Sequence, residues 1–365
     1  MTSRERVLTA MRRRQPDRPP FDLSFGFSTA QLETFRARTG ADDPCDYFEA
    51  DTRMVWPGPT RLTTDFSAYL GPLPPGTVVD EWGLAHIPTA SEEGDHAHLE
   101  GYRHPMRHLE SPADAAAYPL PDVDAAYRYE PVRAEIERLH GRGLAAMAML
   151  ECTVFERAWY LRSMERLLLD FADGSAFATT LLDRITERRV GQAQHYARCG
   201  ADVIAYGDDV GTQRGMLMSA PLWRAWLKPR LARTIAAARD VRPDVLVFYH
   251  SDGDVSAIIP DLIEIGVDIL NPVQPECMDP AALKRAYGQR LSFWGTIGTQ
   301  STLPFGSPDD VRHEVRRRIE TVGAGGGLFL APTHVIEPEV PFENIVAFVD
   351  AVKNEGRSQR PTRYA

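Results

Sequence analysis

Residues Val245–Asp254 read VLVFYHSDGD, and the interpretation of the whole chain starts from this stretch. The uninterrupted apolar run Val245–Tyr249 predicts a short buried strand, because strands covered on both faces show little polar alternation. The run ends directly in His250 and Asp252, and Gly253 then allows a tight bend. We therefore expect a buried strand whose C-terminal end carries an imidazole and carboxylates.

The same pattern, an apolar run that ends in polar residues, recurs through the second half of the chain. Expected strands lie at 144–150, 203–206, 245–249, 267–270, 291–294 and 328–331. The segments between and around them predict helices at 131–139, 157–172, 176–198, 219–239, 255–265, 279–287, 308–322 and 342–354. Strands that alternate with helices in this way indicate βαβ units and a parallel sheet.

The N-terminal third supplies the remaining strands. Helices are expected at 3–14 and 28–40, and the apolar run Phe21–Phe25 between them is expected to be the first strand. Six strands from residue 144 onward and two from this third make eight, so the predicted fold class is α/β, a (β/α)8 TIM barrel. A doubly wound open sheet is the alternative, but the chain has no glycine fingerprint of the dinucleotide-binding type.

Residues 44–122 interrupt this regular pattern. Prolines, glycines and short alternating pieces within 44–100 predict a small β-hairpin or an irregular excursion, and loops with one short helix follow up to residue 122. We expect this excursion to lie near the barrel mouth without a hydrophobic core of its own. The expected organisation is a single domain, 1–355, with a disordered polar tail, 356–365.

Composition narrows the possible partners. The chain has a formal net charge of −10 and no clustered basic stripe, which argues against nucleic-acid binding. No apolar segment is long enough to span a bilayer, and the N-terminus has no apolar signal core. The four cysteines are scattered without a CxxC pair, which fits a reducing cytoplasm better than a disulfide framework. We expect a cytoplasmic enzyme with a small-molecule substrate.

The chemistry is expected where the strands end, because the active site of a (β/α) barrel lies at the C-terminal ends of its strands. The polar residues that follow the expected strands are Glu151, Asp208, Asp209, His250, Asp252, Asn271, Gln274 and His334. Two imidazoles and a carboxylate, from His250, Asp252 and His334, can bind a zinc or iron ion with one position open. Hydrogen bonds from the same two histidines to an anionic substrate are the alternative interpretation.

Several of these stretches carry a family resemblance. They read HSDGD at 250–254, IPDLIEIGVDILNPVQ at 259–274, MDPAALKRAYGQRLSFWGTI at 278–297, GGGLFLAPTH at 325–334 and VPFENIVAF at 340–348. With RERVLTAMRRRQPDRPPFD near the N-terminus, FERAWY at 155–160 and GDDVGTQRG at 207–215, they resemble the uroporphyrinogen decarboxylase superfamily. The resemblance covers nearly the whole chain, least clearly residues 40–120, and implies a (β/α)8 barrel.

The resemblance implies one of two activities. True uroporphyrinogen decarboxylases use no cofactor and grip substrate carboxylates with an arginine-rich segment after the first strand; this chain has DLSFGF at 22–27 there. The superfamily's methyltransferases are linked to cobalamin, thiols or folate, and many hold zinc on a His-x-Cys motif and a distant cysteine. Here the motif reads His250-Ser-Asp252, and His334 takes the distant position, so a site of nitrogen and oxygen ligands is expected.

The preferred prediction is a methyltransferase-like enzyme whose metal ligands are His250, Asp252 and His334. The resemblance adds cobalamin or tetrahydrofolate as methyl carrier, a corrinoid protein as partner and a homodimer. Catalytic roles are predicted for Glu156, Asp208 and Asp209, and substrate contacts for Glu151, Arg214, Asn271, Gln274 and Trp294. The alternative is a cofactor-free decarboxylase of a small or tetrapyrrole-like acid, with Arg157, Arg162 and Arg214 as candidate carboxylate-binding residues. A non-catalytic binding protein is the third possibility.

Overall fold

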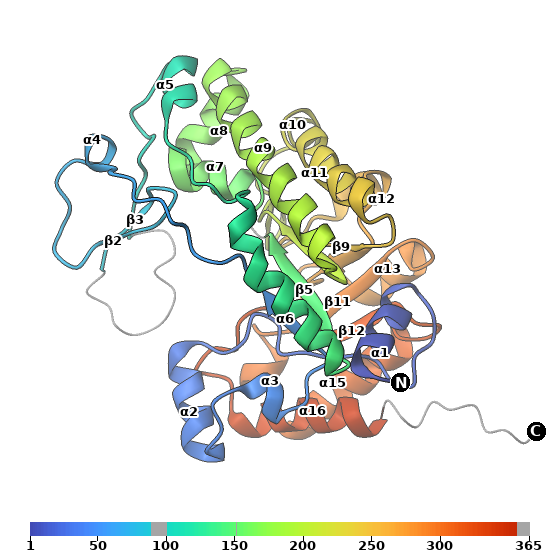
Figure 1. The fold of residues 1–365 in the computed structure, drawn as a ribbon. Coiled ribbons are helices and arrows are strands. Elements are labelled where there is room, and N and C mark those ends of the chain that lie inside the picture. The colour runs from blue at the N-terminus through green and yellow to red at the C-terminus, as the bar shows by residue number, and fades with distance from the viewer. Residues whose placement is uncertain (89–100, 151, 356–365) are drawn as a thin grey trace, which may run out of the picture.

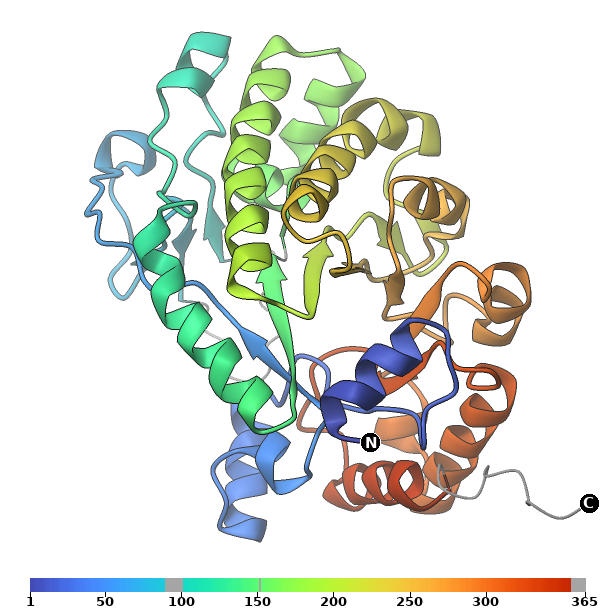
Figure 2. The same cartoon turned by 45° about the vertical axis from the view of Figure 1, so that its right-hand side comes forward.

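The computed structural model describes residues 1–88, 101–150 and 152–355. Its centre is a curled parallel sheet of seven strands in the order β1-β5-β6-β9-β10-β11-β12, surrounded by helices (Figures 1 and 2). The strands are β1 (Thr52–Val55), β5 (Ala145–Leu150), β6 (Val203–Gly207), β9 (Leu246–His250), β10 (Ile269–Asn271), β11 (Ser292–Ile297) and β12 (Leu328–Pro332). Five of the six expected strands from residue 144 onward are present within two residues of the expected bounds, and the sixth, 291–294, extends to Ile297.

The eighth position of the barrel is filled by a segment that forms no regular strand. Phe21 makes a single parallel bridge to Leu330 of β12, and Pro20 O accepts a hydrogen bond from Leu330 N. On the other side, Phe21 O accepts a hydrogen bond from Asp51 N at the start of β1. The sheet therefore closes on itself, and the predicted (β/α)8 barrel is confirmed. The expected strand Phe21–Phe25 was too long, because pairing with β12 reaches only Asp22 and the chain turns at Ser24 and Phe25.

Helices form the outer layer of the barrel. They are α1 (Ser3–Met11), α2 (Thr29–Thr39), α3 (Pro44–Tyr47), α6 (Glu130–Gly141), α7 (Phe155–Arg162), α8 (Met164–Ala172), α9 (Ala176–Cys199), α10 (Ala220–Trp226), α11 (Lys228–Val241), α12 (Ile259–Glu264), α13 (Pro280–Tyr287), α14 (Thr302–Phe305), α15 (Pro308–Thr321) and α16 (Phe342–Glu355). None of the described helices has the length and apolar content needed to cross a lipid bilayer.

Two helices that the sequence predicts as continuous are broken. The expected helix 157–172 divides into α7 and α8 at Ser163, whose φ of 75° lies in the left-handed region and whose side chain accepts a hydrogen bond from Arg166 N to cap α8. The expected helix 219–239 divides at Leu227 into α10 and α11. Pro229 has no backbone N–H for the preceding turn, which explains the second break.

The barrel interior is filled by alternate residues of the strands. They form one buried cluster, distinct from the larger one between sheet and helices, and include Met147, Met149, Ala205, Phe248, Trp294 and Phe329. Val7, Ala10 and Met11 of α1 belong to the same interior cluster, and the Met11 carbonyl accepts a hydrogen bond from Ser292 Oγ at the start of β11. Helix α1 therefore covers the N-terminal end of the barrel (Figure 2), and the C-terminal end is the mouth.

The expected excursion, 44–122, was given too early a start, because α3 and the barrel strand β1 (Thr52–Val55) lie within it. Beyond β1 the excursion contains a small antiparallel sheet of β2 (Val78–Val79), β3 (Ala85–His86) and β4 (Tyr102–Arg103), with α4 (Ser67–Leu70) and α5 (Pro112–Ala117) beside it. Its buried residues Phe66, Trp82 and Tyr118 belong to the cluster that also joins the barrel sheet to its helices. We propose on this basis that 1–355 form one domain. The expected tail, 356–365, lies outside the described residues.

Candidate active site

Three acidic or imidazole side chains meet where β6 and β9 end. Ligand atoms of Asp209, His250 and Asp252 all lie within 4.8 Å of one another. His250 Nε2 is 3.5 Å from Asp209 Oδ1 and 3.9 Å from Asp252 Oδ1. The parallel register explains the meeting, because His250 lies opposite Gly207, two residues before Asp209. The sequence placed Asp209 among the catalytic candidates, and the structure brings its carboxylate beside His250 and Asp252.

Asn271 orients the imidazole of His250. Asn271 lies beside His250 in the sheet, its Oδ1 is 2.6 Å from His250 Nδ1, and its Nδ2 donates to the carbonyl of Trp294 at 3.0 Å. Because Nδ2 is engaged as a donor, Oδ1 must be the atom that faces the ring, so Nδ1 carries the proton. His250 Nε2 then faces the two carboxylates.

The loop that carries Asp252 is fixed by close backbone packing. Asp252 N donates to Asp209 Oδ1 at 2.7 Å, and Gly253 N donates to Gln274 Oε1 at 2.6 Å. Gly253 has a φ of +80°, and a Cβ there would lie 2.5 Å from the Thr212 carbonyl oxygen. Only glycine fits this crossing, so the spacing that the sequence shows after β9 is required to bring both carboxylates to His250.

His334 stands at the edge of this cluster. It follows β12, its Nε2 is 4.0 Å from Asp252 Oδ2, and its ring centroid is 6.5 Å from that of His250. Burial raises the pKa of Asp252, and the two imidazoles oppose that rise. Burial also lowers the pKa of His334, against the attraction of Asp252. His334 thus shares the mouth with the cluster without belonging to it.

Phe25 is the residue of the mouth that the sequence did not single out. Its ring is edge-on to His250, with centroids 5.0 Å apart, and tilted against His334 at 5.7 Å. It sits in a turn in which Ser24 has a φ of 54° and donates its N–H to Asp22 Oδ1 at 2.8 Å. Phe25 follows the bridge at Phe21 in a loop, so no strand or helix periodicity marks it.

Asp22 is buried below this turn. We expect the ionisation of its carboxyl group to make the free energy of unfolding depend on pH. Burial raises the pKa of Asp22 to about 7, against the hydrogen bonds from Ser24 and Thr52. Between pH about 4 and 7 the folded state holds a proton that the unfolded state has lost, so stability falls as pH rises. This rise in the pKa of Asp22 corresponds to a loss of unfolding free energy on the order of 4 kcal/mol across the window. Asp22→Asn should therefore gain in stability relative to the wild type across this window and stay level above it.

Urea unfolding of the wild type and Asp22→Asn at pH 4.5 and pH 8 measures this difference. The subtraction removes titrations that the two proteins share. An equal difference in unfolding free energy at both pH values would contradict the expectation.

Several predicted site residues serve the structure around the mouth. Asp208 is buried and accepts backbone hydrogen bonds from Val154 and Glu156, so it caps the start of α7 from the neighbouring strand. Burial raises the pKa of Asp208 to about 6, and these amides lower it. Gln274 holds Gly253, as described above, and Trp294 is stacked on Phe329 inside the barrel, 1% exposed. These three side chains are buried, and the hydrogen bonds and stacking described here tie them to the structure around the mouth.

The remaining candidates divide by exposure. Arg214 is exposed at the tip of a hairpin formed by β7 (Gly211–Thr212) and β8 (Gly215–Met216). Arg162 is not available to a substrate, because its fully buried guanidinium binds Asp170 and the carbonyl of Met106. Glu156 is half-buried at the first turn of α7, and Arg157 follows it. Glu151 lies outside the described residues.

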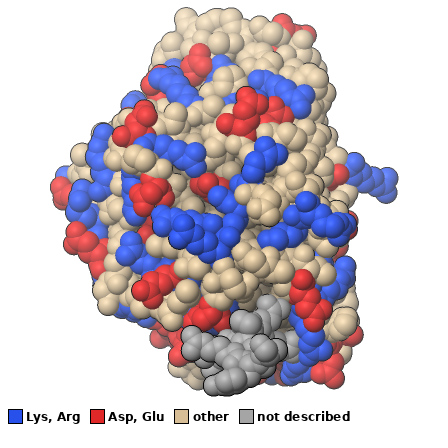
Figure 3. All heavy atoms as spheres, turned by 90° about the vertical axis from the view of Figure 1, so that its right-hand side faces the viewer, with Lys and Arg blue, Asp and Glu red and all other residues tan. Residues whose placement is uncertain are grey.

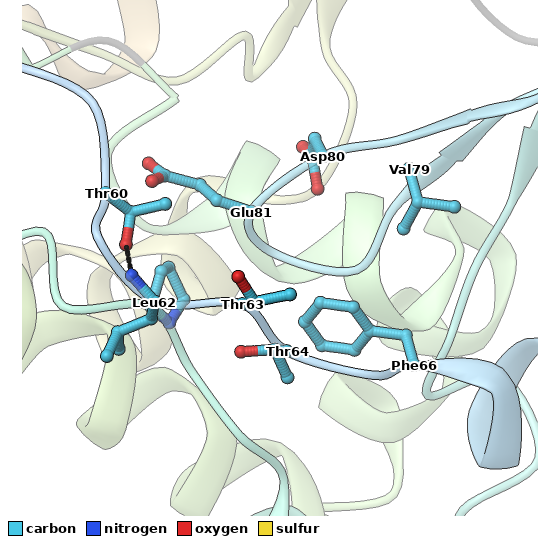
Figure 4. A pocket seen from close by; sticks show the side chains of 9 residues that line it. Thr60, Leu62, Thr63, Thr64, Phe66, Val79, Asp80 and Glu81 are labelled. Atoms are coloured by element: carbon cyan, nitrogen blue, oxygen red, sulfur yellow. Dashed lines mark hydrogen bonds between the residues drawn. The ribbon is translucent and has the colours of Figure 1, made fainter.

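A hollow of about 280 Å³ opens in the excursion. Figure 4 shows it between Asp80 and Glu81 on one side and Thr63, Thr64 and Phe66 on the other. On the face drawn in Figure 3, basic and acidic side chains are interspersed, so its described part carries both signs of charge. Neither feature competes with the mouth as a place for catalysis.

Comparison with known proteins relates the chain to two kinds of enzyme. The model of the uroporphyrinogen decarboxylase (URO-D) family matches residues 104–355. A methylcobamide:CoM methyltransferase, MtaA, of Methanosarcina barkeri is 34% identical over 170 residues, which are 47% of this chain and 47% of that protein. The chain thus spans about half the length of the methyltransferase that it matches.

Two further relatives extend over more of the chain at lower identity. A uroporphyrinogen decarboxylase of Pseudomonas syringae pv. syringae is 24% identical over 249 residues, 66% of this chain and 68% of the relative. The solved structure of a methyltransferase from Methanosarcina mazei superposes with a TM-score of 0.65 and 21% identity, covering 97% of this chain and 99% of that chain. This structural likeness supports the barrel fold.

Proposed function

The chain belongs to the uroporphyrinogen decarboxylase family, and from this premise we propose that it is a methyltransferase that holds a divalent metal ion at the barrel mouth. The observation that carries the proposal is the cluster of Asp209, His250 and Asp252, with ligand atoms within 4.8 Å of one another. The similarity to a methylcobamide:CoM methyltransferase supports methyl transfer as the reaction type.

The cluster fits a metal ion better than it fits a set of mutual hydrogen bonds. Asp252 Oδ1 is buried and accepts no hydrogen bond from the described residues, and a buried carboxylate oxygen is stable only with a partner. Asn271 also directs His250 Nε2 toward the carboxylates. A cation between the three side chains supplies a partner for Asp252 Oδ1.

The donor set indicates which ions suit the site. One imidazole and two carboxylates are harder ligands than the thiolates of a sulfur-rich zinc site, so zinc or iron(II) with oxygen-bound substrates is favoured. His334 is near enough to Asp252 to add a second imidazole after a small side-chain rotation. When bound, the ion supplies Lewis acidity that polarises the group exchanging the methyl.

The surrounding residues have separate tasks in this proposal. In a methyl transfer the bond from carbon to the donor breaks, its electron pair stays with the donor, and an electron pair of the acceptor forms the new bond. When Asp209, His250 and Asp252 alone hold the ion, His334 Nε2, which stands beyond Asp252, can take the proton that the acceptor loses. Phe25 covers both imidazoles and excludes water from that side of the cluster.

The finer parts of the proposal come from the relatives. A corrinoid, free or on a carrier protein, is the proposed methyl donor, with tetrahydrofolate as the other carrier class. A homodimer and a cytoplasmic location are proposed with it. Decarboxylation of a small carboxylic acid is the second candidate function, because Arg157 offers a cation at the mouth for a carboxylate.

Metal loading and methyl transfer test this proposal together. We expect the purified protein to bind about one zinc or cobalt(II) ion per chain, and to consume methylcobalamin with a thiol or phenol acceptor only when loaded. Metal content is measured by elemental analysis, and methylcobalamin consumption by its visible absorbance. Protein that binds no metal and decarboxylates a small acid in the presence of a chelator would favour the second candidate instead.

A further inference from the structure

Two arginines surround one tryptophan beside the mouth. The guanidinium carbon of Arg157 lies over the ring of Trp82 at 4.7 Å from its centroid, and that of Arg189 at 5.1 Å. Arg157 comes from the first turn of α7, Arg189 from the middle of α9, and Trp82 from the turn between β2 and β3. The excursion thus brings an indole against two positive charges.

These charges are matched only weakly by carboxylates of the described residues, because Asp208 attracts Arg189 without a hydrogen bond to it and Asp80 lies at the limit of contact with Arg157. Arg189 is 4% exposed and donates only to neutral acceptors, the carbonyls of Cys152 and Thr153 and Gln192 Oε1. Arg157 reaches one carboxylate, that of Asp80, at a long 3.5 Å, and its buried Nε has no acceptor.

Asp80 is itself occupied elsewhere. Its Oδ1 accepts hydrogen bonds from the backbone amides of Trp82 and Leu84, both at 2.9 Å, and so shapes the turn that carries Trp82. Its other oxygen is shared between Arg157 and, at 4.0 Å, His86. The Asp80 carboxylate therefore mainly stabilises the turn that carries Trp82, and it neutralises the arginines only weakly.

Two neighbouring cations away from water repel each other strongly. Burial, and then the charge of Arg157, lower the pKa of Arg189 to about 10. A buried charge without a partner costs several kcal/mol, so such an arrangement is stable when a further anion arrives. The cation–π contacts with Trp82 offset a part of this cost only.

The arginine pair is connected to the C-terminal end of the barrel sheet through α7. Helix α7 starts where β5 ends, and its second residue, Glu156, is bonded through its amide to Asp208, the residue before Asp209 of the metal cluster. Tyr160, one turn further, lies 5.6 Å from the Arg157 guanidinium and packs edge-on against Tyr102 at 5.5 Å. Arg157 and these rings thus lie next to the strand ends that carry the acidic cluster.

We propose that Arg157, supported by Arg189 and walled by Trp82 and Tyr160, binds the carboxylate of an aromatic or other planar organic substrate. The planar fork of a guanidinium matches a carboxylate in two parallel hydrogen bonds, and the rings offer faces for stacking. This inference rests on the proposed function for the reacting end of the substrate, which lies at His250. Arg157, Tyr160 and Arg189 lie within residues 104–355, which the family model matches, and Trp82 lies outside them.

Benzoate and its neutral isostere benzamide test the subsite by calorimetry on the full chain. We expect wild-type protein to bind benzoate at least 10-fold more tightly than benzamide, and Arg157→Gln to weaken benzoate at least 10-fold without changing benzamide. The benzoate affinity of Arg157→Lys, which keeps the charge and loses the planar guanidinium, should lie between those of the wild type and Arg157→Gln. Arg166→Gln is the matched control, since Arg166 lies exposed on the next helix and pairs with Glu110.

Stability separates a binding role from a structural one. Removal of an unmatched cation should leave the melting temperature of the ligand-free protein unchanged or higher, whereas a structural arginine would lower it. Equal benzoate affinity in Arg157→Gln and wild type, or equal affinity of wild type for benzoate and benzamide, overturns the inference. His250→Ala should bind benzoate with the affinity of the wild type. The benzoate result can therefore be interpreted even if the methyl-transfer proposal fails.

Discussion

His250→Ala is expected to abolish metal binding and turnover together while the protein remains folded. The imidazole is the centre of the cluster, and without it Asp209 and Asp252 form a pair of carboxylates that repel each other. Outer partners of a metal ligand typically contribute 10–100-fold in affinity, so loss of the ligand itself should exceed about 100-fold. The ring ends a strand at the mouth and lies outside the interior cluster, so the barrel should tolerate its removal.

Elemental analysis, methylcobalamin consumption and thermal unfolding of the same preparation measure this result. Asn271→Ala gives a graded comparison, since it removes the hydrogen bond that orients the ring and keeps the ring itself. His313→Ala, an exposed histidine on α15, is the matched control and should resemble the wild type. A His250→Ala protein that retains its metal and its rate would rule out the cluster as the metal site.

The sequence was most informative where chemistry depends on parallel register. Strand ends after residue 144 could be located from apolar runs, and in a closed parallel barrel all such ends meet at one mouth. His250, Asp209 and Asn271 therefore came together as expected of neighbouring strands. The polar ends of these strands predicted the place of the candidate site before any side-chain geometry was available.

Neighbouring residues at one strand end were harder to separate. Asp208 and Asp209 are adjacent and chemically identical, yet one caps α7 and the other faces His250. Asp208 accepts from backbone amides after β5, whereas Asp209 accepts from the amide of Asp252 after β9. The difference therefore depends on two loops from other parts of the chain. Gln274 is a similar case, because its amide oxygen is used by Gly253 and not by a substrate. Residue type alone cannot distinguish these roles.

The sequence indicated a strand near Phe21, but it did not show how the barrel closes at this point, which is called the seam here. Phe21 makes one bridge instead of a regular strand, so no alternation of buried and exposed residues marks the segment. Phe25 is positioned by the turn that follows. The closure depends on a side chain far along the chain. Asp51 Oδ2 accepts a hydrogen bond from Phe21 N, while the backbone of Asp51 pairs with Phe21 on one side and Ala145 on the other.

Asp51→Ala is expected to destabilise the protein by about 3–5 kcal/mol, because it removes one partner of a buried ionic network. The carboxylate is fully buried and binds Arg6 Nη1 at 2.7 Å and Arg18 Nη1 at 2.8 Å. Without it two nearly buried guanidinium groups lose a partner at the point where the sheet closes. Urea unfolding at neutral pH measures the change, and retained secondary structure shows that the variant still folds.

Asp17→Ala is the control for this network. Asp17 also binds Arg6, at 2.7 Å, but its side chain is 30% exposed and water can replace it. We expect a loss of at most about 1 kcal/mol there, as for other exposed ion pairs. Similar losses in the two variants would show that the seam is held by backbone pairing and apolar packing. A much larger loss for Asp51→Ala would mean that the Asp51 carboxylate supplies hydrogen bonds that a regular strand would otherwise make. The same carboxylate would then also hold the turn that places Phe25 over the two histidines.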